Sequence, residues 1–215
     1  MRFHTTQFSR AVAVFLVFGA CSSGPTSESE KSNASNSSTS TEQPVELVAT
    51  LGRTSVHGTG IEPGTRAKLD KAIAAKVIAV VDQFVQTSLV GPLEGRPVDF
   101  DGLLTPDVAT RLATGKPDRS VLTTEGIISA SRVHAELAKV RLVALTEGLG
   151  SISLISASID FDATLTSDGT QLTVQHVGEI LLAEDSGWKI VGYEMTVTRD
   201  DGSSATSETS AVVTP

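Results

Sequence analysis

The most constraining feature of the chain is a strict alternation of apolar and polar residues in its second half. Between residues 155 and 166, apolar residues occupy every odd position, and Ser, Thr or Asp occupies every even position. An alternation of period two is typical of a β-strand with one buried and one solvated face. Asp168-Gly169 follows, and this pair is typical of a two-residue hairpin turn. The pattern therefore predicts antiparallel strands over 155–166, 172–183 and 188–199.

The first half of the folded region has the period of a helix instead. Apolar residues recur every three or four positions between residues 65 and 89, which predicts one long helix that ends at Gly91-Pro92. A second, shorter helix is marked by Thr105 as N-cap, Pro106 as first residue and Gly115 as the end.

Two further segments are expected to be extended or irregular. The apolar phase slips inside residues 132–146, which predicts a β-bulge in one bent strand. Residues 46–51 are expected to form a short strand, and the glycines between Gly58 and Gly64 a loop. Two helices followed by antiparallel strands make an α+β layout.

This order of elements resembles the NTF2-like (cystatin-like) family. The resemblance rests on Leu103–Leu112 (LLTPDVATRL), on the bulged strand at 131–146, and on Gly187–Tyr193 (GWKIVGY). It implies a cone over about 65–200, with the long N-terminal helix and the short helix packed on a curved antiparallel sheet of about four strands. Domains of this family include enzymes, binders and scaffolds, so the resemblance does not decide the function.

The N-terminus reads as a targeting segment. Arg2 and Arg10 precede ten uncharged residues, 11–20, which suit a signal peptide and are too short to span a membrane. Phe18-Gly19-Ala20-Cys21 resembles the lipobox of bacterial lipoproteins, with Phe18 where Leu is usual. The resemblance implies that Cys21 carries lipid and holds the protein on the extracytoplasmic side of the cell membrane. The alternative is a plain secretion signal with an incidental cysteine.

Composition divides the rest of the chain and excludes several classes of protein. Residues 21–45 are expected to be a disordered linker, since twelve of the twenty residues 22–41 are Ser or Thr. The domain is expected over 46–201, and 202–215 as a disordered tail. The net charge of −8 argues against nucleic acid as a partner, and a single cysteine excludes a disulfide scaffold and a Cys/His zinc module.

Candidate catalytic residues are few. His176 shares its strand phase with apolar residues, so it is predicted to face inward, and His176 with Tyr193 or Asp160 is the best catalytic candidate. His134 lies on a polar strand face, as a surface histidine would. Asp160 and Asp162 share one face about 7 Å apart, either as an acid–base pair or as part of a solvated surface.

No motif specifies a cofactor or metal. Asp99-Phe-Asp101-Gly102 starts like a calcium loop, but the later ligands are missing. The interpretation is a non-catalytic, lipid-anchored binding or scaffolding module with an envelope protein as partner. The alternatives are a carrier of a small apolar ligand or lipid, and an isomerase or hydrolase. The binding interpretation rests on an interior expected to be filled by Ile73, Val77, Val80, Phe84, Ile159, Phe161, Val174, Trp188 and Ile190.

Overall fold

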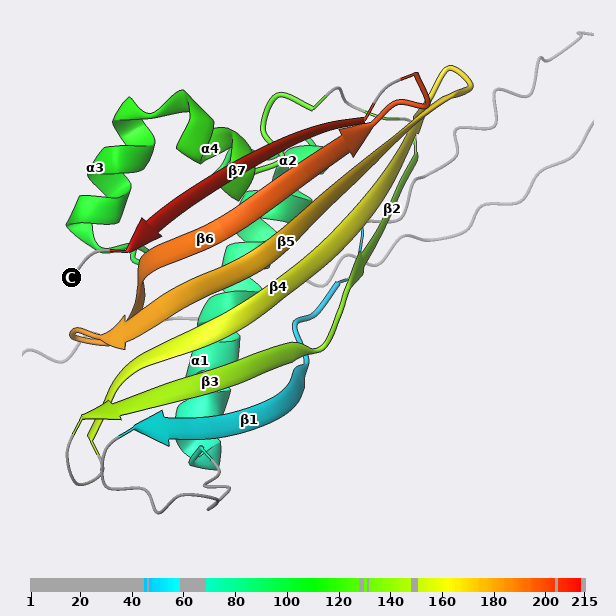
Figure 1. The fold of residues 1–215 in the computed structure, drawn as a ribbon. Coiled ribbons are helices and arrows are strands. Elements are labelled where there is room, and N and C mark those ends of the chain that lie inside the picture. The colour runs from blue at the N-terminus through cyan, green and yellow to red at the C-terminus, as the bar shows by residue number, and fades with distance from the viewer. Residues whose placement is uncertain are drawn as a thin grey trace, which may run out of the picture. The chain divides into compact units, whose positions relative to one another are not determined.

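A seven-stranded sheet dominates the computed structural model, which describes residues 45, 47–58, 69–127, 130, 132–147, 151–203 and 205–213. The strand order is β1-β3-β4-β5-β6-β7, and β2 pairs with β4 beside β3 (Figure 1). All pairs are antiparallel except β1 with β3, which is parallel. The strands are β1 Leu51–Gly58, β2 Arg132–Leu137, β3 Val140–Glu147, β4 Ser151–Ser167, β5 Thr170–Glu184, β6 Trp188–Asp200 and β7 Ala205–Val213.

The helices cover one face of this sheet (Figure 1). They are α1 Lys71–Phe84, the π-helix η1 Val85–Val90, α2 Gly91–Leu93, α3 Pro106–Thr114 and α4 Lys116–Leu122. α1 crosses the middle of the sheet, whereas α3 and α4 lie by β6 and β7. The covered face is called the inner face below, and the opposite one the outer face.

The predicted fold, a long and a short helix on a four-stranded NTF2-like cone, is wrong. The central strands β4, β5 and β6 and the short helix α3 lie where the alternation and the capping residues place them. The sheet is nevertheless extended to seven strands. β1 occupies residues expected in part to form a loop, and β7 occupies Ala205–Val213, within the segment 202–215 predicted to be a disordered tail. The three segments that resemble the NTF2-like family therefore belong to a sheet that differs from the one this resemblance implies.

The phase slip at 132–146 marks a break between two strands rather than a bulge in one. β2 and β3 both pair with the same edge of β4, β2 with its second half and β3 with its first. Between them, the backbone N–H of Ala138 donates to the carbonyl of Asp160 at 2.9 Å. The two residues between the strands shift the apolar phase by one, so that both strands bury their apolar side chains.

The long helix does not end at Gly91-Pro92. Asp70 caps its start by accepting from the N–H groups of Ala72 and Ile73, and the helical path runs on to Leu93 through the π-helix. Proline cannot donate to the carbonyl four residues earlier, which is that of Ser88. That carbonyl accepts from the N–H of Thr124 at 3.1 Å instead.

The same threonine binds the helix a second time. Its side-chain Oγ1 donates to the carbonyl of Leu89 at 2.6 Å, and Thr124 is almost fully buried. The segment after α4 thus donates to two carbonyls of the irregular turn, and one of them, that of Ser88, has no N–H at Pro92 to accept from. The proline is tolerated because another part of the chain completes the hydrogen bonding.

The extended segment before β1 lies along the same helix in the opposite direction. The N–H of Val45 donates to Glu94 Oε1 at 2.8 Å, and that of Ala49 donates to Asp82 Oδ1 at 2.7 Å. Between them, the side-chain amide of Gln86 donates to the carbonyl of Leu47. Residue 45 therefore lies at the α2 end of the helix.

The core lies between the helices and the inner face of the sheet. Of the nine residues predicted to fill the interior, seven are buried, with Trp188 the most exposed of the seven at 8%. Ile73 and Val80 are partly buried and pack against the same cluster. The helix turns a slightly different face inward than predicted, with Ala74, Val81 and Val85 buried as well.

Candidate functional site

His176, the best catalytic candidate from the sequence, faces inward as predicted and is completely buried. Its Nδ1 lies 2.9 Å from the carbonyl oxygen of Val121 in α4, so Nδ1–H donates and Nε2 is left as an acceptor. Nε2 has no hydrogen-bond partner among the described residues. The ring meets Phe161 edge-on, with centroids 6.1 Å apart.

Burial makes His176 a very weak base. The loss of solvation lowers its pKa to about 4, outweighing the hydrogen bond to Val121, and the positive charge of Arg199 lowers it further. At neutral pH the ring is uncharged and holds α4 through one hydrogen bond.

The predicted catalytic group does not assemble. Asp160 is exposed on the outer face, whereas its strand neighbour Phe161 pairs with His176 on the inner face. Tyr193 faces inward, but it lies opposite Ile180, four residues along β5 from His176 and thus about 13 Å away along the strand.

Tyr193 lies instead beside a polar network that joins α3, α4 and the edge of the sheet, and its buried hydroxyl has no hydrogen-bond partner among the described residues. Arg111 Nε donates to Asp118 Oδ2 at 2.9 Å, and Ser210 in β7 donates its hydroxyl to Asp118 Oδ1. Burial raises the pKa of Tyr193 to about 12, and the neighbouring Asp118 carboxylate raises it too. Burial alone would raise the pKa of Asp118, but hydrogen bonds from Arg111 and Ser210 outweigh it and lower that pKa.

Further polar contacts fix α4 against β6 and β7. Ser120 donates its hydroxyl to Glu208 Oε2 at 2.7 Å, and Arg199 Nη2 donates to the carbonyl of Ser120 at 3.2 Å. Together with His176 and Asp118, these contacts connect a seven-residue helix to three strands. The arrangement positions α4, and His176, the histidine in it, bonds only to a backbone carbonyl among the described residues.

Sequence reasoning missed α4 and with it this network. A signal was available, since Gly115 is followed by Pro117 and Asp118, the residues that favour a helix start. The partners could not have been found, because Asp118 and Ser210 lie 92 residues apart.

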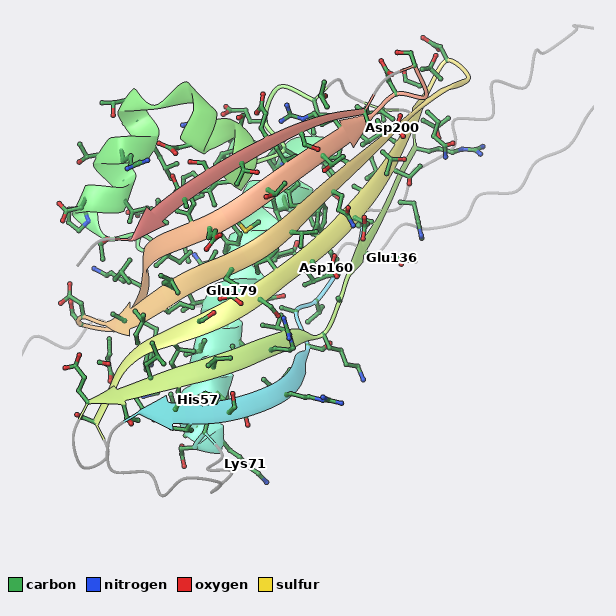
Figure 2. All side chains as sticks on the ribbon, in the orientation of Figure 1. His57, Lys71, Glu136, Asp160, Glu179 and Asp200 are labelled. Atoms are coloured by element: carbon green, nitrogen blue, oxygen red, sulfur yellow. The ribbon has the colours of Figure 1, made fainter. Side chains whose placement is uncertain are left out.

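The outer face of the sheet carries small hydroxyl residues and carboxylates (Figure 2). Thr196 and Thr209 bond through their hydroxyls at 2.9 Å, and Thr198 and Ser207 at 3.1 Å. Carboxylates form a band across four strands, contributed by Glu136, Asp160, Asp162, Glu179 and Glu194.

Like charges lie directly opposite each other in this band. Glu136 faces Asp162, and Glu179 faces Glu194. Such pairs oppose folding of the sheet. Partial burial raises the pKa of Asp162, and the charges of Asp160 and Glu136 raise it further. Asp160 and Asp162 are therefore part of a charged surface rather than an acid–base pair at a cavity.

The other predicted sites are ordinary surface features or lie outside the described residues. His134 is exposed on β2 and lies 3.2 Å from Glu136. Asp99 accepts from the N–H of Asp101 in a turn, and no group of three metal-ligating side chains occurs in the described part of the chain. Cys21, the predicted signal peptide 1–20 and nearly all of the predicted linker 21–45 lie outside the described residues.

One helical stretch, Lys71–Leu93, is long and apolar enough to cross a membrane by composition, with a mean hydropathy of 1.5. Its buried side packs against the sheet, with Val77, Val81 and Phe84 fully covered. A helix in the core of a soluble protein also meets these criteria of length and composition. Because its buried side packs against the sheet, we assign this stretch to the core.

Comparisons with known proteins give no family for this chain. No family model, no curated protein and no solved structure matches it.

Proposed function

We propose that this protein is a lipid-anchored extracytoplasmic module that binds a protein partner on the outer face of its sheet and acts without catalysis. Cys21 after an uncharged ten-residue run supports the anchor. The contrast between the two faces of the sheet supports the binding role.

That contrast is the observation that carries the proposal. On β4 the inward residues Ile155, Ile159 and Phe161 are at most 1% exposed. Large side chains from α1 fill the space above them, among them Val77 and Phe84, both fully buried. Side chains occupy the positions that a carrier would need for a lipid, so contacts with other molecules are left to the outer surface.

The charge of the outer face sets the chemistry of the partner. The five carboxylates of this band include two like-charged pairs that repel each other. This repulsion decreases when positive groups approach the band. The proposed partner therefore presents lysines or arginines to β4 and β5, and its affinity falls as salt is added.

The path of the chain supports the tethered arrangement. The hydrogen bond from Val45 to Glu94 places the end of the proposed linker at α2. About 24 flexible residues between Cys21 and residue 45 would have a reach of roughly 27 Å. The domain would then sit close to the membrane without being inserted in it.

Site-specific photo-crosslinking in intact cells tests this proposal. A photoreactive residue replaces Ser158 or Thr173, both on the outer face, or Lys76, which is exposed on α1, as the matched control. We expect one crosslinked protein at the outer positions and none at residue 76. Equal labelling at all three positions would contradict the proposal, and a crosslink to lipid alone would favour a carrier.

A further inference from the structure

The free edge of β7 differs from the other free edges of the sheet. β1 is interrupted by a register shift between Leu51 and Thr54 and presents an exposed arginine, Arg53. β2 has only six residues, and three of them are charged or histidine and exposed. Irregularity, short length and charge are the usual protections of a sheet edge against pairing with another chain.

β7 is neither short nor irregular, and it carries a single charge. It pairs with β6 over nine consecutive residues without a register shift, and its sequence ATSETSAVV contains no Pro, Gly, Lys or Arg. Its one charge, Glu208, already accepts a hydrogen bond from Ser120. No described strand pairs with its other edge. Alternate backbone N–H and C=O groups of an edge strand point away from the sheet and remain open for pairing.

We propose that β7 pairs antiparallel with β7 of a second copy of this chain, around a two-fold axis at Thr209. An antiparallel pair of identical strands has this symmetry, which is the commonest one among oligomers. In that register Thr209 lies opposite Thr209 of the second copy, and Ser207 lies opposite its Ala211. Glu208 lies opposite Ser210, so no two carboxylates face each other.

The hydroxyl pairs of the outer face favour this occupant. Thr209 already bonds to Thr196, and Ser207 to Thr198, across β6 and β7. A second β7 would continue the same row of hydroxyl side chains, so small neutral residues meet small neutral residues across the new pair. The dimer would join two outer faces into one sheet, and it does not depend on the proposed function.

The test uses the full chain with Cys21→Ser, which removes the candidate lipid anchor. Sedimentation velocity measures its dimer dissociation constant at about 100 mM and 500 mM NaCl. Because the chain carries a net charge of −8, we expect the dimer to tighten as salt screens the repulsion. A chain that stays monomeric at millimolar concentration overturns the proposal.

Two lysine variants locate the contact. Thr209→Lys places two positive charges across the axis, and we expect it to weaken the dimer at least about tenfold. Thr196→Lys is the matched control, because it removes the same hydroxyl pair and adds the same charge one strand away from the edge. It should leave the dimer within about threefold of the parent. Equal weakening by both variants would contradict pairing through β7.

A charge exchange separates loss of pairing from loss of folding. Thr209→Glu alone should weaken the dimer for the same reason as Thr209→Lys. Mixed in equal amounts, the two variants should form a heterodimer in native mass spectrometry, because opposite charges then meet at the axis. Variants that both fold, by circular dichroism, and still fail to pair in the mixture would overturn the proposed register.

Discussion

His176 is a neutral, buried histidine whose burial penalises its protonated form. In the unfolded chain its pKa returns to about 6.5, whereas in the folded protein it is about 4. Between these values the unfolded state binds more protons than the folded state. The free energy of unfolding therefore falls as the pH drops from above 6.5 towards 4, and above 6.5 this histidine has no effect.

The first prediction follows from this difference. Across that window His176 should remove about 3 kcal/mol of stability, with Asp118 adding a loss in the same direction at lower pH. His176→Asn keeps a donor near the position of Nδ1 but does not titrate. Urea unfolding at pH 7.5, 6.0 and 5.0 should give a much flatter pH dependence for this variant than for the parent.

The control for this prediction is His134→Asn. His134 is exposed on β2, so its replacement should leave the pH dependence as it is in the parent. Identical slopes for the parent and His176→Asn would mean that His176 titrates normally and is not enclosed beneath α4.

Within the secondary-structure elements, the contact of Thr124 with the π-helix explains how a long helix passes through a proline. The carbonyls of Ser88 and Leu89 both accept hydrogen bonds from Thr124. Thr124→Val keeps the shape and the backbone N–H but removes the hydroxyl donor to Leu89. We expect a loss of about 1 kcal/mol in the free energy of unfolding, the usual net contribution of one hydrogen bond.

A matched variant isolates that hydrogen bond. Thr87 also donates its hydroxyl to a carbonyl, that of Gln83, but within the helix and at a partly buried position. Thr87→Val should change the stability by less than about 0.5 kcal/mol. Denaturant unfolding measures both, and equal effects of the two substitutions would contradict a special role for Thr124.

The elements that could be predicted from the sequence are those with one buried and one solvated face. β4, β5, β6 and α3 have that contrast, and the alternation or the capping residues found them. β1 and β7 could not be found this way, because neither edge strand alternates buried apolar residues with exposed polar ones. By composition β7 resembles the Ser/Thr-rich linker, and only its pairing with β6 distinguishes it.

The same limit applies to the candidate site. The inward direction of His176 follows from its strand phase, so it was predictable. Its partner Val121 lies 55 residues away in the sequence, and Ser210, which bonds to Asp118, lies 92 residues from it; a strand or helix pattern does not encode such contacts.

At the scale of the whole molecule, the proposed anchor is tested by Cys21→Ser. The substitution removes the only thiol in the chain, and with it the proposed site of lipid attachment. We expect the protein to move from the membrane fraction to the soluble fraction or the medium, as measured by immunoblotting of fractionated cells. A membrane-bound fraction equal to that of the parent would contradict lipid attachment at Cys21.

The last prediction concerns the C-terminal segment, which the sequence suggests is a dispensable tail. Ending the chain after Asp201 removes β7, its nine-residue ladder with β6, and the hydrogen bonds of Ser210 and Glu208 to α4. The entropy of ordering β7 offsets part of these interactions. We expect the shortened protein to lose at least about 2 kcal/mol of stability. Hydrogen exchange should show faster exchange at two places, the β6 amides that face β7 and α4.

A full-length control separates the strand from its side chains. Glu208→Ala with Ser210→Ala removes the two bonds to α4 but keeps the ladder, so α4 alone should exchange faster while β6 stays protected. A shortened protein with parental stability and unchanged exchange would show that residues 202–215 are no part of the sheet. The outcome also decides whether β7 holds α4 in place or whether β5 and β6 are enough. Three residues at the β7 edge of the sheet are affected, namely Asp118, Ser120 and Tyr193.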